Sequence, residues 1–373
     1  MYPTTSSRVT RRTLLAAFFL LAACDAGPTE PVAPTRPATP FPESPVAQNP
    51  FYQGVFLGDA ETTPERVGAA IGDFARLVGN RPALVKTFFR LESDFSAEGW
   101  AGRVVRQIDA ASATNFIALD LRWSDAPNTG LLDAILAGKA DARLQGIARE
   151  VAALGRPVLL EPGWEMNGDW SYPWQGAANG AERQAPARFV AAWRHIVNTF
   201  RQAGATNVLW VFSPNVGNPI ARTGAGAAHW NWYGHYYPGD EYVDYVGAHG
   251  FHAPTLWGGP YTDFNTLFDG AYADLMLSDL SSRFPNKPIL IGEFAAEETP
   301  GRNKGDWVRG AFAAIHDRPA IAGAVWFHMK KEADWRVDSS AGALAAYRSA
   351  QAHPRTRVAF TPPPMGGTLL AGN

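Results

Sequence analysis

The chain has 373 residues, of which 46% are hydrophobic and 18% are charged. This composition supplies enough apolar side chains for a large folded core and carries too little charge for a disordered chain. The 33 basic and 35 acidic side chains nearly balance, which argues against nucleic acid as a partner. Because the chain has a single cysteine, intrachain disulfides and cysteine-rich zinc sites are excluded.

The amino terminus has the pattern of an export signal. A basic stretch, residues 8–12, precedes an apolar run, residues 14–23, which is too short to span a bilayer. The run ends in the letters LAAC and so resembles the processing box of bacterial lipoproteins, in which the cysteine receives lipid. We therefore predict a signal peptide at residues 1–23 and a lipid anchor on Cys24, at the periplasmic or cell-surface side of the bacterial envelope. Ordinary signal cleavage with Cys24 incidental is the alternative, and the paired arginines leave both general secretory and twin-arginine export open.

Residues 24–50 are predicted to form a tether between this anchor and a folded body. Between Pro28 and Pro50 the sequence places 8 of its 29 prolines, mixed with Thr, Ala and Glu. Such a segment cannot pack into a core and forms an extended, semi-rigid spacer. The rest of the chain, residues 51–373, is then one large domain.

The body alternates short apolar strands with amphipathic helices. The apolar spacing predicts helices over 67–78 and 189–200, and Gly79, Gly155 and Gly204 follow helix ends. Strands are expected at residues 52–58, 83–89, 115–123, 157–162, 208–213, 243–251, 288–294 and 323–328. Eight β-then-α units in series predict a closed (β/α)8 TIM barrel of the α/β class. An open doubly wound sheet is the alternative, but the Gly-rich phosphate turn typical of its first strand is missing.

Tryptophans gather where such a barrel builds its chemistry, which is at the carboxyl ends of the strands and in the loops that follow them. Nine of the 13 tryptophans fall there: Trp123, Trp164, Trp170, Trp174, Trp230, Trp232, Trp257, Trp326 and Trp335. Flat indole faces suit the apolar faces of sugar rings, although some of these rings are expected to anchor long loops instead. The pattern favours a carbohydrate site.

Two glutamates stand at the ends of strands that face each other across the barrel mouth. Glu165 follows the fourth strand, and Glu293 ends the otherwise apolar seventh strand. An ionised carboxylate in such a place is costly unless it has a partner or a function. Glycosidic cleavage requires paired carboxylates, because one protonates the leaving oxygen while the other attacks the anomeric carbon or activates water. A buried salt bridge is the structural alternative for each glutamate alone.

Four strand ends carry motifs that can be compared with known families. They are EMNGDW beginning at Glu165, WxxSPN ending at Asn215, GEF around Glu293, and Trp326 on the eighth strand. Together they resemble glycoside hydrolase family 26, best known for β-mannanases, over roughly residues 51–350. The resemblance implies that Glu165 is the acid/base, Glu293 the nucleophile and Trp326 the aromatic floor under the cleaved sugar.

The chain departs from that family's pattern at two places. The family has Arg-Pro-x-His before the acid/base, whereas this chain has Glu161 and Trp164 at the outer positions. The strand-six tyrosine that hydrogen-bonds the nucleophile is replaced by Phe251, so His249 or His252 is expected to supply the donor. These departures leave the reaction class intact and the identity of the sugar open.

Glu161 is also a rival acid, because it lies four residues before Glu165. We predict instead that it pairs with Arg122, and that Asp120 on the same strand is structural. A metal held by the two histidines and Glu293 is a further alternative, but no H-x-x-x-H or H-E-x-x-H pair is present. Neither a metal nor a cofactor is expected.

The leading hypothesis is a monomeric, exported, lipid-anchored retaining endo-glycosidase that acts on a β-linked polysaccharide, with β-1,4-mannan as the first candidate. Substrate contacts are predicted for Trp164, Asn167, Trp170, Trp174, Asn215, His249, His252, Trp257 and Trp326. The indoles of the loops after strands four to six are expected to line a cleft longer than one sugar. An exopolysaccharide-remodelling hydrolase and a non-catalytic polysaccharide-binding lipoprotein are the alternatives. The presence of both glutamates favours an enzyme.

Overall fold

The computed structural model describes residues 49–170, 172–180, 184–216, 229–270, 273 and 276–362. The predicted signal peptide, Cys24 and nearly all of the tether lie outside these residues and stay predictions. Within the described part of the chain, no helix combines the length and the apolarity that a membrane span requires.

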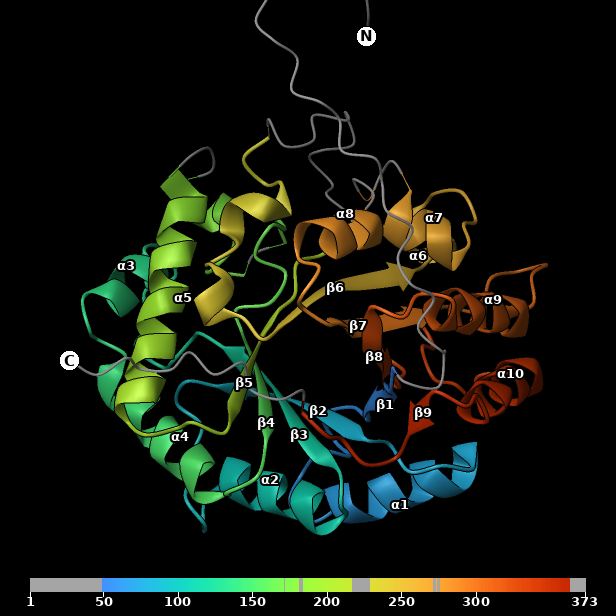
Figure 1. Cartoon of the computed structure of the whole chain (residues 1–373), viewed down its shortest axis with the longest axis horizontal. Coiled ribbons are helices and arrows are strands. Elements are labelled where there is room, and N and C mark those ends of the chain that lie inside the picture. Colours follow the sequence, from blue (N-terminus) through green and yellow to red (C-terminus); the bar gives the residue numbers. More distant parts are fainter. Residues whose placement is uncertain are drawn as a thin grey trace, which may run out of the picture. The chain divides into compact units, whose positions relative to one another are not determined.

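Eight parallel strands close into a barrel (Figure 1). They are β1 (Phe51–Phe56), β2 (Leu84–Arg90), β3 (Thr114–Asp120), β4 (Val158–Pro162), β5 (Val208–Phe212), β6 (Tyr245–His252), β7 (Ile289–Ala296) and β8 (Ile321–Phe327). Each strand pairs with the next along the chain, and β1 pairs with both β2 and β8, which closes the sheet. The predicted (β/α)8 barrel is confirmed, and each of these eight strands overlaps a predicted one.

Helices follow the strands and surround the barrel (Figure 1). The α-helices are α1 (Val67–Val78), α2 (Trp100–Ala110), α3 (Leu131–Leu136), α4 (Asp141–Ala153), α5 (Gln184–Gln202), α6 (Pro254–Trp257), α7 (Phe264–Asp269), α8 (Met276–Arg283), α9 (Lys304–His316) and α10 (Ala341–Gln351). Short 3-10 helices, η2 (Gly176–Asn179), η4 (Tyr233–Tyr236) and η5 (Asp240–Tyr242), lie after β4 and β5. A two-residue strand, β9 (Thr356–Arg357), adds to the edge of β1.

Local sequence explains where the helices begin and end. In α1 the buried side chains form one stripe at helical spacing, so one face of the helix packs on the barrel. The helix ends at Gly79, whose φ of 89° is left-handed and which therefore suits a glycine. The predicted stops at Gly155 and Gly204 also have positive φ, at 63° and 83°.

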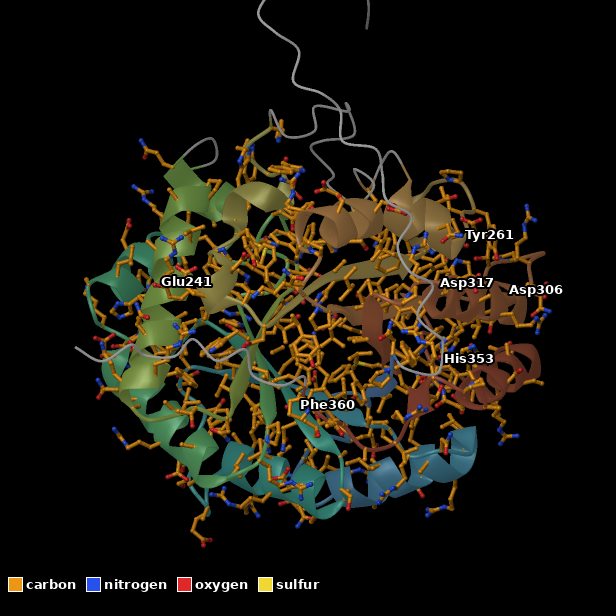
Figure 2. The ribbon with its side chains drawn as sticks, in the orientation of Figure 1. Glu241, Tyr261, Asp306, Asp317, His353 and Phe360 are labelled. Atoms are coloured by element: carbon orange, nitrogen blue, oxygen red, sulfur yellow. The ribbon has the colours of Figure 1, made fainter. Side chains whose placement is uncertain are left out.

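Side chains fill the barrel and close its amino-terminal end (Figure 2). There the ring of Phe360 packs against Tyr52 of β1 and Tyr245 of β6, with centroids 4.8 and 6.4 Å away. The Tyr52 hydroxyl also donates to the carbonyl of Thr361 at 2.8 Å. Open space is therefore found at the other end, where the strands have their carboxyl termini.

Strand β7 is irregular at the carboxyl end of the barrel. Its pairing with β6 shifts register between Ala248 and His249, and its pairing with β8 shifts between Ile291 and Phe294. Such bulges are common beside active sites, because they change the direction in which a side chain points. Glu293 lies inside this irregular stretch.

Candidate active site

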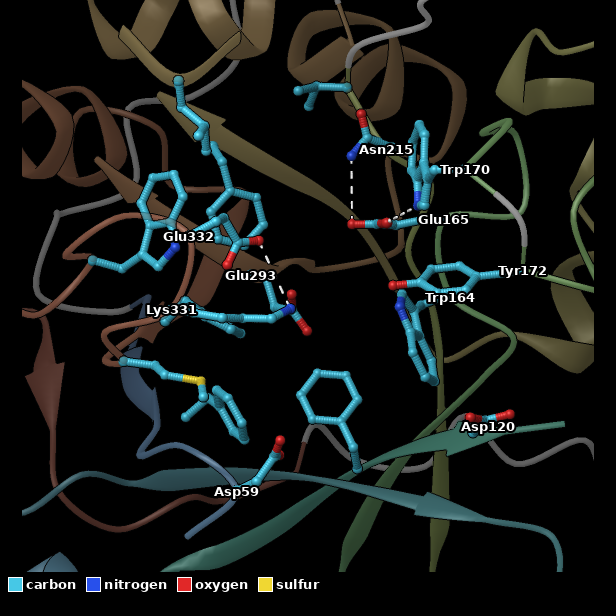
Figure 3. A pocket seen from close by; sticks show the side chains of 18 of the residues that line it. Asp59, Asp120, Trp164, Glu165, Trp170, Tyr172, Asn215, Glu293, Lys331 and Glu332 are labelled. Atoms are coloured by element: carbon cyan, nitrogen blue, oxygen red, sulfur yellow. Dashed lines mark hydrogen bonds and ion pairs between the residues drawn. The ribbon is translucent and has the colours of Figure 1, made fainter. Parts of the chain in front are cut away.

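A cavity of about 980 Å³ opens at the carboxyl ends of the strands (Figure 3). Glu165 and Glu293 both line it. The aromatic residues of its wall are Phe56, Phe88, Trp164, Trp170, Tyr172, Phe251, Trp257, Phe327 and Trp335. The cavity thus combines two carboxylates with many rings, as the sequence predicts for a sugar site.

Glu165 is held in an uncommon backbone conformation. Its φ is +54°, a left-handed value that costs a non-glycine residue about 1–3 kcal/mol and that clusters at functional sites. Two hydrogen bonds hold this turn: the Glu165 amide donates to the carbonyl of Ser213 at 2.9 Å, and Gln175 donates to the carbonyl of Glu165 at 2.9 Å. The turn after β4 therefore fixes the direction of the Glu165 side chain.

Two donors from the loops after β4 and β5 contact the Glu165 carboxylate (Figure 3), in addition to His249 of β6. The indole N–H of Trp170 donates to Oε2 at 2.9 Å, and Asn215 Nδ2 donates to Oε1 at 3.4 Å. Asn215 is in turn fixed by Asn167, which exchanges two hydrogen bonds with the Asn215 backbone at 2.9 and 2.8 Å. Asn167 therefore orients Glu165 through Asn215.

Glu293 is only 5% exposed and lies against a buried ammonium group. Lys86 Nζ, on β2, is 2.8 Å from Glu293 Oε1. Burial raises the pKa of Glu293, as do Glu165 and Glu161, whereas Lys86 and His249 lower it. The net direction is upward, so Glu293 ionises at a higher pH than an ordinary glutamate.

His249 lies between the two cavity carboxylates. Its Nδ1 is 3.1 Å from Glu165 Oε1 and 3.9 Å from Glu293 Oε2. Because both oxygens lie near one nitrogen, they are at most about 7 Å apart. This limit, which applies to one oxygen of each carboxylate, is compatible with the spacing of about 5 to 5.5 Å between the two carboxyl groups of a retaining glycosidase.

Beneath these carboxylates, Lys86, Glu161 and His249 form a fully buried cluster, called here the basal cluster. Glu161 Oε2 is 2.6 Å from Lys86 Nζ, and Glu161 Oε1 is 3.0 Å from His249 Nε2. Burial opposes ionisation of Glu161, but Lys86 and His249 lower its pKa to about 2. Burial and Lys86 lower the pKa of His249, whereas Glu161 and Glu293 raise it, with a net value of about 9. All three members are therefore charged at neutral pH.

Among the described residues, one group of side chains has the geometry to hold a metal. Glu161, His249 and Glu293 offer ligand atoms within 4.8 Å of one another. However, the ammonium of Lys86 lies 2.6 Å from Glu161 and 2.8 Å from Glu293, so a cation already neutralises these two carboxylates, and it also lies 3.3 Å from His249 Nε2. The donor set therefore does not fit a metal, and His252, which we had considered as a ligand, is absent from the group.

The structure brings four of the nine predicted substrate contacts to the cavity wall. These are Trp164, Trp170, Asn215 and Trp257, the last of which is 57% exposed. The other five, Asn167, Trp174, His249, His252 and Trp326, are buried and do not line it. Of these, Asn167 and His249 act on Glu165 from behind, while Trp174 donates its indole N–H to the carbonyl of Trp164 at 2.8 Å and supports that ring.

Two predicted contacts need a physical correction. Trp326 points to the helix side of β8, where its ring packs on Trp307 and Tyr347, so it is not the floor of the cavity. His252 likewise stacks on Trp307, at 5.5 Å between centroids, and burial lowers its pKa to about 4. The residues that replace them on the wall are their strand neighbours, Phe327 and Phe251.

The predicted partner of Glu161 is also wrong. Arg122 pairs with Asp120, and Glu161 pairs with Lys86 instead. Sequence reasoning missed Lys86, although a lysine inside the apolar string ALVKTFF was a signal that a buried anion must face it. The wall residue Tyr172 was also missed as a site residue, although it stands in the YPW string after the acid/base motif.

Comparisons with known proteins support one family of glycoside hydrolases. Residues 131–296 match the family model of Glycosyl hydrolase family 26. The chain is 39% identical over 285 residues to Endoglucanase H of Acetivibrio thermocellus, an alignment that covers 76% of this chain and 29% of the relative. It is 28% identical over 134 residues to Mannan endo-1,4-beta-mannosidase A and B of Caldalkalibacillus mannanilyticus, covering 35% and 21%. The chain thus spans less than a third of the length of these relatives.

Solved structures support the fold. A modular endo-β-1,4-mannanase from Cellulomonas fimi matches with a TM-score of 0.59 and 20% identity, covering 83% of this chain and 72% of that one. The catalytic domain of a family 26 endo-β-1,4-mannanase from a Bacillus species matches with a TM-score of 0.61 and 18% identity, covering 84% and 88%. At these identities the likeness concerns the barrel alone.

Proposed function

We propose that this chain, a member of glycoside hydrolase family 26, cleaves internal β-linkages of a polysaccharide with retention of anomeric configuration. One observation carries the proposal: Glu165 and Glu293 face one cavity and approach the same nitrogen of His249. A binding protein has no use for two carboxylates at this spacing, whereas a double displacement requires them.

We assign to each carboxylate the role that the family resemblance implies. Glu293, on β7, attacks the anomeric carbon, while Glu165 donates its proton to the leaving oxygen. Water then enters and gives a proton to Glu165, and its oxygen bonds to the anomeric carbon as the ester bond to Glu293 breaks. Trp170 and Asn215 hold Glu165 in position, and Lys86 favours the ionised nucleophile.

The extent of the cavity supports cleavage inside chains. Its wall runs from Trp170, after β4, to Trp257, after β6, and on to Trp335, after β8. Trp230 and Trp232, which we predicted to extend this line, are not part of the wall. The cleft therefore turns toward the loop after β8, and its size suits more than one sugar unit.

β-1,4-Mannan is the first candidate substrate, because the solved neighbours and one relative bear that activity in their names. β-Glucan is the second, and a specific observation favours it: the relative with 39% identity is named an endoglucanase. Trp164, which lines the cavity, and Glu161, which is buried behind it, stand where the family's His and Arg are expected, so the site differs from the mannanase pattern there.

A substrate screen tests the proposal. The soluble body, from about residue 48, is incubated with β-1,4-mannan, β-glucans, xylan and bacterial exopolysaccharides, and viscosity and reducing ends are followed. A rapid fall in viscosity that requires both Glu165 and Glu293 supports endo-cleavage. Binding without any release of reducing ends contradicts it and favours the non-catalytic alternative, and release from exopolysaccharide alone favours the envelope-remodelling alternative.

We also propose that the enzyme is exported and held at the cell envelope by lipid on Cys24. The support is the LAAC string and the absence of any other cysteine. Several acyl chains hold a protein on a membrane stably, whereas one binds only marginally, so Cys24→Ser should release or misprocess the protein. A wild-type protein that enters the aqueous phase of a detergent separation and has no lipid mass contradicts this.

A further inference from the structure

We infer that Glu161 is a positioning residue that serves both reaction steps, by holding Lys86 against Glu293 and His249 against Glu165. The inference rests on the proposed function and adds a third glutamate to it. Glu161 is fully buried and does not line the cavity, so it acts through the two cations and not on the sugar.

The contacts of Glu161 divide evenly between the two sides of the site. Oε2 is 2.6 Å from Lys86 Nζ, whose next contact is Glu293 Oε1 at 2.8 Å. Oε1 is 3.0 Å from His249 Nε2, whose other nitrogen is 3.1 Å from Glu165 Oε1. Each cation is therefore shared between Glu161 and one of the carboxylates that face the cavity.

A purely structural role explains this arrangement poorly. Burying charged side chains in a barrel core costs free energy of desolvation. Replacing a buried ion pair by well-packed apolar side chains of the same volume often leaves stability unchanged or increases it. The rings of Phe88 on β2 and Phe116 on β3 lie 5.4 and 4.7 Å from Lys86 Nζ, so apolar groups also surround this charge. Apolar side chains could fill the same space, so a charged basal cluster that reaches both cavity carboxylates is explained by what it does for them.

The reaction explains why two cations are needed. In the first step Glu293 loses its negative charge as its oxygen forms the bond to the anomeric carbon. Glu165 gains a negative charge as its proton goes to the leaving oxygen, whose bond to that carbon breaks. In the second step water gives a proton to Glu165, and its oxygen bonds to the anomeric carbon. The bond from that carbon to Glu293 breaks, so Glu293 becomes negatively charged again. Lys86 stabilises the charge on Glu293 and His249 the charge on Glu165, while Glu161 keeps both cations in place throughout.

The charged and titratable groups that face Glu293 determine its pKa, and therefore how the pH profile of activity changes when Glu161 or Lys86 is replaced. They are Lys86 from β2, Glu161 from β4, Glu165 and Tyr172 from the loop after β4, and His249 from β6. Glu161 raises the pKa of Glu293 and Lys86 lowers it more strongly. Removing Glu161 alone should thus move the acidic limb of the activity profile to lower pH, and removing both should move it to higher pH.

The test compares Glu161→Gln with the double variant Lys86→Met/Glu161→Gln, which removes both members of the shortest buried ion pair of the basal cluster together. Tyr347→Phe is the control, because it removes a buried hydrogen bond to Gln53 of β1, away from the cavity. We expect kcat on the polymer to fall at least about tenfold in both test variants, with KM changed less than about threefold. The acidic limb should move in opposite directions in the two variants, and Tyr347→Phe should change only stability.

Two results overturn the inference. One is a folded Glu161→Gln variant with wild-type kcat and an unchanged pH profile. The other is a double variant that regains wild-type kcat, because Glu161 would then only neutralise Lys86; this result decides the question even if the single variant does not fold. Failure of the proposed function looks different, since the wild-type enzyme itself would then release no sugar.

Discussion

Replacing Trp170 by Phe removes one hydrogen bond from the acid/base and keeps an aromatic ring in the cavity wall. The indole N–H is 2.9 Å from Glu165 Oε2. A hydrogen bond to a charged group contributes about 1.5–3 kcal/mol, which corresponds to a loss of about 10- to 100-fold in a step that depends on Glu165. The sequence predicts only a substrate contact for Trp170, whereas the structure adds a hydrogen bond to the acid/base.

Aryl glycosides with different leaving groups separate the two roles. A good leaving group departs without a proton, so Trp170→Phe should lower kcat/KM little for such a substrate. For a poor leaving group and for polymer, kcat/KM should fall by about 10- to 100-fold. Trp257→Phe is the matched control, because Trp257 lines the same cavity, is 57% exposed and lies on another loop. It should raise KM for polymer without changing the dependence on the leaving group. Equal losses for Trp170→Phe across all leaving groups would refute the reasoning.

Further predictions concern the nucleophile, its pH dependence and the misplaced tryptophan. Glu293→Ala should abolish turnover, and NMR of the first product of the wild type should show the retained anomer; the inverted anomer contradicts the mechanism. Because burial raises the pKa of Glu293, the nucleophile is protonated and activity is lost as pH falls through a value above the usual range of a glutamate, and a limb at or below that range would oppose this. Trp326→Phe should leave KM and the leaving-group dependence unchanged and lower the free energy of unfolding by about 1–3 kcal/mol, measured by denaturant titration, since it loses buried atoms and the hydrogen bond to the carbonyl of Trp335.

The fold followed from the sequence because its signals are local. Apolar runs, helical spacing and glycines such as Gly79 are each read within a few residues, and all eight strands were found at nearly the right places. Glu165 and Glu293 were paired correctly because strand order in a closed barrel decides which strand ends meet.

The errors in the site concern two properties: the face of a strand to which a side chain points, and the partner of a buried charge that is distant in the sequence. Neighbouring residues on a strand point to opposite faces, so Phe327 faces the cavity while Trp326 faces the helices. The same rule separates Phe251 from His252. Choosing the inward residue requires the exact phase of each strand, and an aromatic at a strand end suits either face.

The partners of buried charges could not be read from spacing. Arg122 follows β3, the neighbour of the strand that carries Glu161, which made their pairing reasonable, but Lys86 reaches Glu161 across the barrel interior. The register shifts around Glu293 also bring Lys86 and His249 to it, and a bulge has no clear signature in one sequence.

Gly292 gives a last prediction, because the basal cluster needs the space that its missing side chain leaves. A Cβ at this position would stand 2.5 Å from His249 Nε2 and 2.8 Å from Glu161 Oε1, closer than real contacts allow. Gly292→Ala should therefore force these two atoms apart and lower kcat at least about tenfold, as loss of the Glu161 contact does. Gly310→Ala is the control: this exposed position in α9 has nothing within 4 Å, and alanine there should stabilise the helix by about 0.5–1 kcal/mol. Wild-type kcat in a folded Gly292→Ala enzyme would mean that the contact between Glu161 and His249 is not needed for catalysis.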